Sequence, residues 1–115
     1  MIKVMWFLKR AEHLTLAEFR TWWLEVHAPM VEETQRPHLK RYVVNIKTDT
    51  DELPGRPKTD SEWDGIAEQW FADEAGFKAI YGRAISPTRG DTLAHTSKLE
   101  RIIVRETEYE TKGGA

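Results

Sequence analysis

The first apolar run of this chain, Ile2–Leu8, has large side chains on both faces of a predicted strand. Side chains along a strand point to opposite faces in turn, so a strand covered on one face only alternates apolar and polar residues. This run is apolar at both even and odd positions, with Trp6 and Phe7 as neighbours. The runs around Tyr42 and Trp70 show the same two-sided pattern. The sheet that these strands form therefore needs cover on both faces.

Two segments between the predicted strands have the pattern of amphipathic helices. Thr15 and Glu18 have the spacing of a capping box, which predicts that a helix begins at Thr15. Pro29 disfavours helical backbone at the preceding residue, so we predict that this helix ends or kinks there. A shorter helix is predicted to begin at Asp73 and to end at Gly82, because glycine is common just after a helix C-terminus.

The predicted elements follow the order strand, helix, strand, strand, helix, strand. The predicted strands cover residues 2–8, 42–47, 63–71 and 99–106. Residues 83–96 are predicted to be irregular, and the polar stretch 48–62 to be a long excursion that can act as a lid. This order is typical of an α+β, ferredoxin-like βαββαβ sandwich, with a four-stranded antiparallel sheet and both helices on one face. Residues 1–110 are predicted to form a single domain and 111–115 a flexible C-terminal tail.

Two helices can cover only one face of such a sheet. We therefore predict that the open face packs against a second copy of the chain, as a homodimer with its sheets face to face. The alternation along their strands assigns Asn45 and Gln69 to this open face, and two polar side chains there suggest a cavity between subunits. Which alternating set of residues faces the partner stays open at this point.

The composition of the chain argues against several classes of function. The 115 residues have a formal net charge of -2, so no basic excess exists to neutralise a nucleic-acid backbone. No run approaches the roughly 18 apolar residues that span a membrane, and no signal peptide is recognisable. The chain has no cysteine, no His-x-x-x-His motif and no glycine-rich phosphate loop. We expect a cytoplasmic protein without metal or cofactor that binds neither nucleic acid nor membranes.

Two sequence elements resemble those of the EthD family. The first is Trp-x-x-x-His-x-Pro at residues 23–29, and the second is Trp-Asp-Gly-Ile-Ala-Glu-Gln-Trp-Phe at residues 63–71. They occur in the order expected for the family, and the resemblance extends from the N-terminus to the second predicted helix. It implies a dimeric α/β barrel, in which two ferredoxin-like subunits pack sheet to sheet.

The resemblance also implies a range of activities. The family's namesake accompanies a cytochrome P450 system for ether degradation, and relatives include a methylmuconolactone isomerase and fungal polyketide decarboxylases or dehydratases. The wider superfamily includes monooxygenases and polyketide cyclases. We therefore expect an isomerase, decarboxylase, dehydratase or cyclase that uses histidine proton transfer on a small hydrophobic, cyclic or aromatic oxygenated ligand. Two alternatives stay open: a cofactor-independent monooxygenase, and a non-catalytic accessory protein that binds a hydrophobic intermediate.

His27 is the first candidate for a catalytic residue. Phe19, Trp23 and His27 are spaced four apart, so they share one helix face and the imidazole lies among aromatic rings. The near-neutral pKa of histidine suits it to proton transfer. A structural role, in which His27 ties the helix end to a backbone carbonyl, is the alternative. His95 is the second candidate, because a histidine in a predicted loop can reach a substrate site; its alternative is a solvated loop residue.

Five further residues are predicted to contact a substrate. Tyr42 and Asn45 offer hydrogen-bond donors and acceptors to substrate oxygens. Trp6, Trp70 and Phe77 offer flat apolar walls, although ordinary core packing is expected to account for some of these aromatic side chains.

Glu68 is a carboxylate inside an otherwise apolar predicted strand. We interpret it as the partner of an arginine across the sheet, either Arg41 or Arg101. The alternative is a general base whose pKa is raised by burial.

Overall fold

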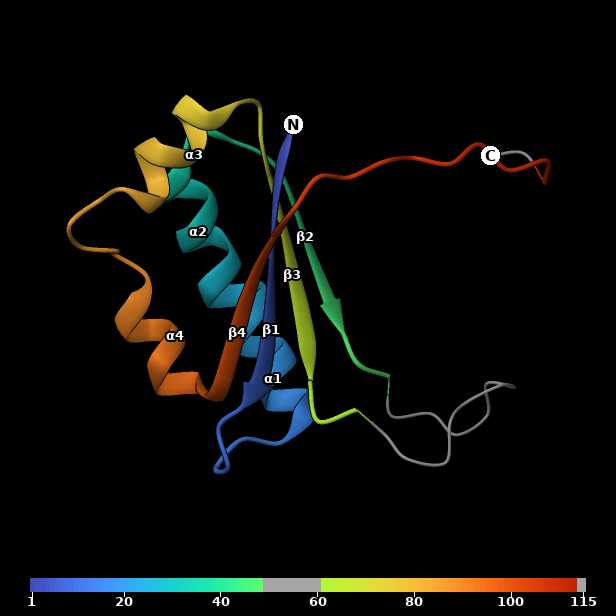
Figure 1. The fold of residues 1–115 in the computed structure, drawn as a ribbon. Helices are drawn as coiled ribbons and strands as arrows, with labels where there is room; N and C mark the ends of the chain where they lie inside the picture. Colours follow the sequence, from blue (N-terminus) through green and yellow to red (C-terminus); the bar gives the residue numbers. More distant parts are fainter. Residues whose placement is uncertain (49–60, 114–115) are drawn as a thin grey trace.

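The computed structural model describes residues 1–48 and 61–113, and these form a four-stranded sheet with helices packed on it (Figure 1). The strands are β1 (Ile2–Arg10), β2 (Leu39–Ile46), β3 (Gly65–Phe71) and β4 (Thr96–Val104). Their order across the sheet is β2-β3-β1-β4, and every neighbouring pair is antiparallel. The predicted ferredoxin-like α+β fold is thereby confirmed. The predicted lid, 48–62, falls almost entirely outside the described residues.

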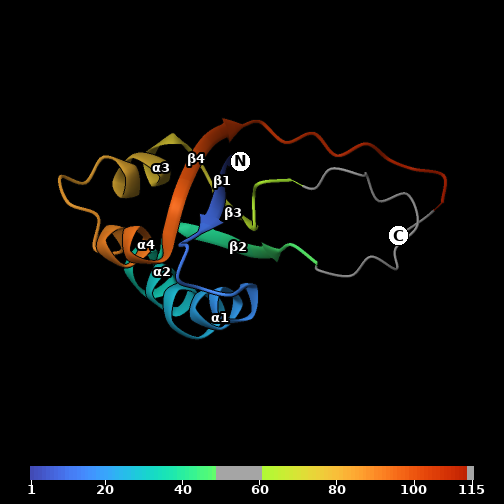
Figure 2. The ribbon, with the colours of Figure 1, turned by 90° about the horizontal axis from the view of Figure 1, so that it is seen from below.

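The helices all lie on one face of this sheet, as Figures 1 and 2 show from two directions. They are α1 (Leu16–Trp22), the π-helical turn η1 (Trp23–His27), α2 (Ala28–Gln35), α3 (Glu74–Tyr81) and α4 (Arg89–His95). The predicted capping box is present: the Thr15 hydroxyl accepts a bond from the Glu18 N–H, and the Glu18 carboxylate accepts one from the Thr15 N–H. None of the described helices is long and apolar enough to cross a membrane.

The sequence predicted that the first helix ends or kinks at Pro29, and the helix does not end there. The chain continues from α1 through η1 into α2, with Pro29 in the first turn of α2. In a regular α-helix a proline lacks one N–H donor and its ring clashes with the carbonyl four residues earlier. Here the backbone widens just before the proline, where the N–H of Ala28 bonds to the carbonyl of Trp23, five residues back. This wider turn accommodates Pro29 and ends at His27, and such turns are frequent at functional sites.

The segment 83–96, predicted to be irregular, contains helix α4. The prediction was wrong because Pro87 and Gly90 are typical of loops and outweighed a weak helical pattern. A helix this short is not stable by itself, so tertiary contacts must hold it. Trp22 of α1 supplies them: its ring stacks on His95 at 4.4 Å and its Nε1 donates to the Asp91 carboxylate at 3.2 Å.

The strand boundaries also differ from those predicted. β2 begins at Leu39, before the predicted start at Tyr42, and β4 begins at Thr96, before the predicted start at Leu99. β3 begins at Gly65 rather than at Trp63. Such shifts of two or three residues are usual at element ends, where the side-chain pattern fades.

The register of the sheet assigns Asn45 and Gln69 to opposite faces, so the prediction that both lie on the open face was wrong. Gln69 pairs with Val4 and with Tyr42, on the face that the helices cover. Its side chain is buried and approaches Gln35 of α2, with 3.5 Å between the two amides. Residues of different strands share a face only if the register places them so, and alternation within each strand does not fix the register.

Large aromatic and aliphatic side chains fill the space between the helices and the sheet. Phe19 and Trp23 have no exposed surface and form one cluster with residues of β1 and β3. Val4 and Phe71 form a second cluster with Ile80 of α3. Each fully buried side chain of this size contributes about 1.5–3 kcal/mol. These clusters anchor η1 and α3, which flank the site described below.

Asp64 and Gly65 fix the start of β3 against its neighbours. The buried Asp64 carboxylate accepts bonds from the Arg10 backbone N–H at 2.8 Å and from its guanidinium at 2.6 Å. Gly65 lies against the indole of Trp23, and a Cβ at this position would lie 2.4 Å from a ring carbon. The Asp-Gly pair in the 63–71 element therefore has two structural roles. Asp64 binds Arg10 at the start of β3, and Gly65 leaves room for the buried Trp23 ring beside the sheet.

Gly65→Ala is expected to destabilise the fold by about 1–3 kcal/mol, because the added methyl overpacks a core site occupied by an indole. Denaturant unfolding measures the change. Gly76→Ala in α3 is the matched control, since a Cβ there meets its nearest neighbour at 3.6 Å, an ordinary contact. Equal stability of Gly65→Ala and the wild-type chain would contradict this role of Gly65.

Candidate active site

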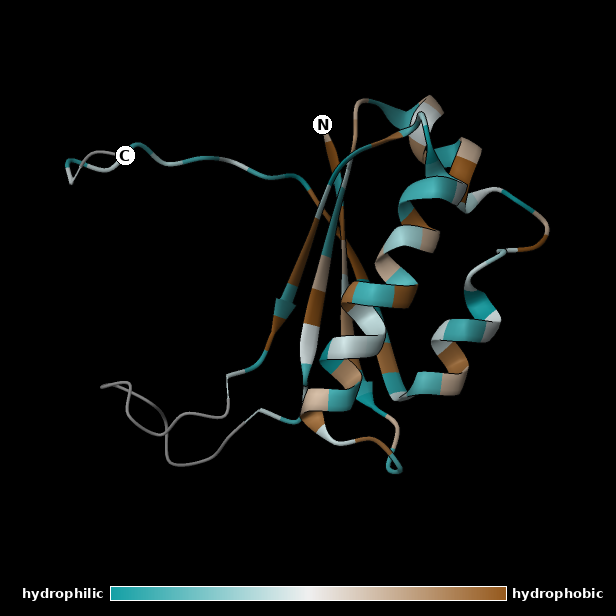
Figure 3. Cartoon of the chain, turned by 180° about the vertical axis from the view of Figure 1, so that it is seen from behind, coloured by the Kyte–Doolittle hydropathy of each residue, from teal (hydrophilic) through white to brown (hydrophobic). Residues whose placement is uncertain are grey.

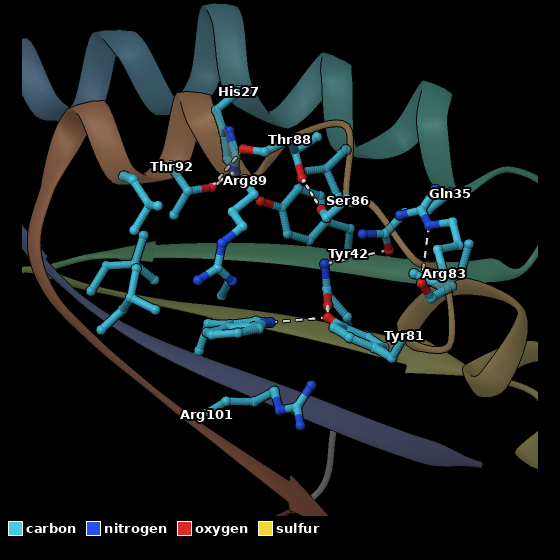
Figure 4. Close-up of a pocket in the computed structure, with 18 of the residues that line it drawn as sticks. His27, Gln35, Tyr42, Tyr81, Arg83, Ser86, Thr88, Arg89, Thr92 and Arg101 are labelled. Atoms are coloured by element: carbon cyan, nitrogen blue, oxygen red, sulfur yellow. Dashed lines mark hydrogen bonds between the residues drawn. The ribbon is translucent and has the colours of Figure 1, made fainter.

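A cavity of about 480 Å³ lies between the sheet and the helices of a single subunit (Figure 4). All four strands contribute side chains to its wall, as do η1, α2, α3 and α4. A cavity of this size suits a small organic ligand. Residues 83–93, from the connection between α3 and α4 and from α4 itself, supply many of its lining side chains. The cavity is therefore on the helix face of the sheet, whereas the sequence suggested one on the open face.

His27 lies at the end of the π-helical turn and faces this cavity. Only 6% of its surface is exposed. Its Nδ1 is 2.9 Å from Oδ2 of Asp91, and its Nε2 is 3.4 Å from Oγ1 of Thr92. An ionised carboxylate only accepts hydrogen bonds, so Nδ1 of a neutral imidazole carries the proton. Nε2 then carries the lone pair, and beside it lies the hydroxyl of Thr92, which is also part of the cavity wall.

Burial lowers the pKa of His27 below its ordinary value of 6.5. The hydrogen bond and the charge of Asp91 act in the opposite direction, and the nearby His95 adds to the lowering. A lowered pKa leaves the imidazole neutral at pH 7 and able to accept a proton.

Asp91 connects His27 to two aromatic neighbours. Trp22 donates its indole N–H to the carboxylate and stacks on the His27 ring at 4.8 Å. The Nδ1 of His95 bonds to the backbone oxygen of Asp91 at 2.7 Å and lies 3.5 Å from its carboxylate. These contacts fix the carboxylate that orients His27. His95, the second predicted catalytic residue, lies behind Asp91 and is not part of the cavity wall.

Tyr42 lines the cavity, and its hydroxyl group is hydrogen-bonded to Trp23. Its hydroxyl oxygen accepts the indole N–H of Trp23 at 2.8 Å. Burial raises the pKa of Tyr42 to about 12, so the phenol keeps its proton at neutral pH. In the part of the chain that the structure describes, this O–H has no acceptor, so it can donate to an oxygen of a bound ligand.

A chain of polar side chains crosses the cavity from Trp6 to α2. The indole of Trp6 donates to the Tyr81 hydroxyl at 2.9 Å, and Tyr81 donates to the amide oxygen of Gln69. The Gln69 amide in turn approaches Gln35. The chain holds these groups in fixed orientations, and Trp6, a candidate substrate contact, belongs to the cavity wall.

Three of the predicted contact residues lie elsewhere. Asn45 is on the open face, where its amide bonds to the Glu68 carboxylate at 3.0 Å. Trp70 is on the same face and is buried beneath charged side chains, with its N–H bonded to Glu106 at 2.6 Å. Phe77 packs in the core against Phe71, 6.2 Å away. None of the three belongs to the cavity wall.

Glu68 pairs with Lys3 on the neighbouring strand at 2.6 Å rather than with Arg41 or Arg101. The bond to Lys3 is the main reason why the pKa of Glu68 is lowered, and the charge of Arg41 adds to it. The sequence interpretation as an ion pair was right in kind but wrong in partner. Lys3 was overlooked because its pairing depends on the register between β1 and β3. A carboxylate with a lowered pKa does not fit the alternative of a raised-pKa base.

Several residues of the site were not predicted from the sequence, among them Asp91, Thr92, Tyr81 and Gln69. The one local signal was the spacing of Asp91 and His95, four residues apart as on a helix. No group of three or more histidine or carboxylate side chains within residues 1–48 and 61–113 is arranged to hold a metal ion.

Comparison with known proteins gives one family and a set of similar folds. The model of the EthD domain matches residues 11–86. An EthD family protein from Bacillus halodurans is 18% identical with a TM-score of 0.67, over 93% of this chain and 99% of that one. Protein At3g17210 from Arabidopsis thaliana is 12% identical with a TM-score of 0.63, over 96% and 100% of the two chains.

A third structure, from Bacteroides fragilis, is described as a dimeric protein of unknown function with a ferredoxin-like fold. It is 12% identical with a TM-score of 0.56, and the match covers 91% of this chain and 95% of that one. None of the curated proteins is significantly similar to this chain in sequence. At these identities the structural matches show the fold alone.

Proposed function

This chain belongs to the EthD domain family, and from that premise we propose that it is an enzyme whose general base is His27. The observation that carries the proposal is the arrangement of one imidazole: Nδ1 bonded to Asp91 and Nε2 on the cavity side. A base held by a carboxylate, with its other nitrogen facing a substrate, is the geometry of general acid–base catalysis.

The proposed step is proton transfer to and from a bound cyclic or aromatic oxygenated metabolite. Nε2 of His27 accepts a proton from a C–H or O–H group of the substrate, and the electron pair of that bond stays on the substrate. The O–H of Tyr42 donates to the oxygen on which negative charge develops. Asp91 stabilises the imidazolium, which then returns the proton to another atom of the substrate. Isomerisation, dehydration, decarboxylation and cyclisation all use such a step, and it needs no cofactor.

A panel of hydroxylated aromatic compounds and cyclic enones tests the proposed reaction class, with products identified by mass spectrometry. We expect conversion without a change in oxygen content, at equal rates with and without dissolved oxygen. Conversion that depends on oxygen and adds an oxygen atom would favour cofactor-independent oxygenation instead. Retention of a ligand in native mass spectrometry without any conversion would favour an accessory binding protein.

We also propose that two copies of the chain pair through the open face of the sheet. None of the described helices covers this face, as the cartoon in Figure 3 shows. The register of the sheet places apolar residues of β1, β2 and β3 on it, among them Met5, Val43 and Ile66. Analytical ultracentrifugation is expected to give twice the mass of one chain, and Val43→Asp is expected to shift that mass to the monomer. A monomeric wild-type chain at micromolar concentration would contradict the proposal.

A further inference from the structure

The cavity has a cationic lining in a chain that is slightly acidic overall. Arg83, Arg89 and Arg101 belong to its wall, and the wall residues that the structure describes include no aspartate or glutamate. The whole chain has 19 acidic residues against 17 lysines and arginines. Positive charge is therefore concentrated at this site, which favours an anionic occupant.

Two of these arginines have no carboxylate partner among residues 1–48 and 61–113. Arg83 is occupied, because its guanidinium donates to the backbone oxygens of Ile80 and Thr34, each at 3.0 Å. Over the described residues, no carboxylate lies within ion-pair distance of Arg89 or Arg101. Both side chains are solvent-exposed, so a ligand entering the cavity can reach their guanidinium groups.

The guanidinium group of Arg101 lies near flat aromatic surfaces. Arg101 lies over the rings of Tyr81 and Trp6, at 5.1 and 5.5 Å. Figure 4 shows Arg89 reaching from α4 into the cavity, between His27 and Arg101. A guanidinium presents a planar fork of donors that matches the two oxygens of a carboxylate. Aromatic rings at the same place offer a surface on which a planar ring can stack.

We propose that the cavity binds a planar cyclic carboxylate, with its carboxylate held by Arg89 and Arg101 and its ring against Trp6 and Tyr81. The inference rests on the proposed function, since it takes this cavity as the substrate site and names the class of substrate. The two arginines and His27 line the same cavity, so a ligand held there lies in one site with the base. The arginines bind and orient the ligand, and His27 moves the proton.

Binding of 2-naphthoate and of its neutral isostere 2-naphthamide, followed by NMR titration of the full chain, tests the inference. We expect the wild-type chain to bind naphthoate about tenfold or more tightly than the amide, since one charge-assisted contact is worth at least this factor. Arg89→Met with Arg101→Met removes both charges and should abolish the preference. Arg89→Lys with Arg101→Lys keeps both positive charges but removes the planar guanidinium donors, so this variant should retain part of the preference for naphthoate. Arg20→Met, at an exposed position on α1, is the matched control and should retain all of it.

Equal affinity of the wild-type chain for the acid and the amide would overturn the inference, as would a preference that survives in the double methionine variant. His27→Gln is expected to bind naphthoate like the wild-type chain, because binding does not need the base. A carboxylate preference without any turnover would therefore leave this inference standing and contradict the proposed function. Turnover of neutral substrates that depends on His27, without a carboxylate preference, would support the proposed function and contradict this inference.

Discussion

His27→Gln is expected to lower kcat by about 10²–10⁴-fold on any substrate that the chain converts, because general acid–base catalysis by one side chain typically contributes that much. The wild-type rate should fall on acidification with a midpoint below pH 6.5, the ordinary value for histidine. The reason is that burial lowers the pKa of His27, so the imidazole stays neutral and basic to lower pH than a solvated histidine. Steady-state kinetics from pH 5 to pH 8 measures both effects.

His27→Asn and His13→Gln separate loss of the base from loss of the fold. The asparagine amide can still donate to Asp91, so His27→Asn keeps the local hydrogen bond while removing the base. His13 is exposed at the start of the helical segment, and its replacement should change neither rate nor stability. If His27→Gln and His27→Asn are folded and as active as the wild-type chain, His27 is a structural residue and the proposed mechanism is wrong.

Asp91→Asn is the second change with a large expected effect, a loss of about 10²–10⁴-fold in kcat. An asparagine can donate to Nδ1 of His27, which favours the tautomer with the proton on Nε2, where no lone pair remains for the substrate. The change also removes a charge that raises the pKa of His27 and stabilises its imidazolium. Asparagine keeps an oxygen for the indole N–H of Trp22, so the packing of α4 should survive.

The pH–rate profile distinguishes positioning by Asp91 from a merely structural role. Loss of the carboxylate should shift the acid limb of the remaining activity to lower pH, because the pKa of His27 falls further. Asp73→Asn, at the N-cap of α3, is the matched control, because asparagine also caps a helix. Full activity of Asp91→Asn with an unchanged profile would contradict the assignment of Asp91.

The order of strands and helices could be predicted because each element has a pattern formed by residues close together in the sequence. The spacing of Thr15 and Glu18, followed by apolar residues at helical intervals, predicts a helix start from a few neighbouring residues, and the two-sided strands follow from alternation alone. The helix does not end at Pro29, because the widened turn Trp23–His27 accommodates the proline, and Pro29 alone does not indicate that turn. α4 was missed because its stability comes from Trp22, which is far away in the sequence.

Three of the candidate site residues, His27, Tyr42 and Trp6, line the cavity, and their roles in it stay predictions. Asn45 was predicted to contact a substrate, but it lies on the face of the sheet opposite the cavity. Strand alternation alone does not reveal which face the helices cover. Asp91 joins His27 only through the folding of 83–96 onto α1, a contact between distant segments.

The most direct test of the central claim is the protonation state of His27 in the ligand-free chain, measured by ¹⁵N NMR of the imidazole with His27→Gln as the assignment control. We predict that at pH 7.5 Nδ1 carries the proton and Nε2 does not, and that the ring titrates below pH 6.5, the ordinary value for histidine. A proton on Nε2, or titration at or above pH 6.5, would contradict the account of His27 as a general base held by Asp91.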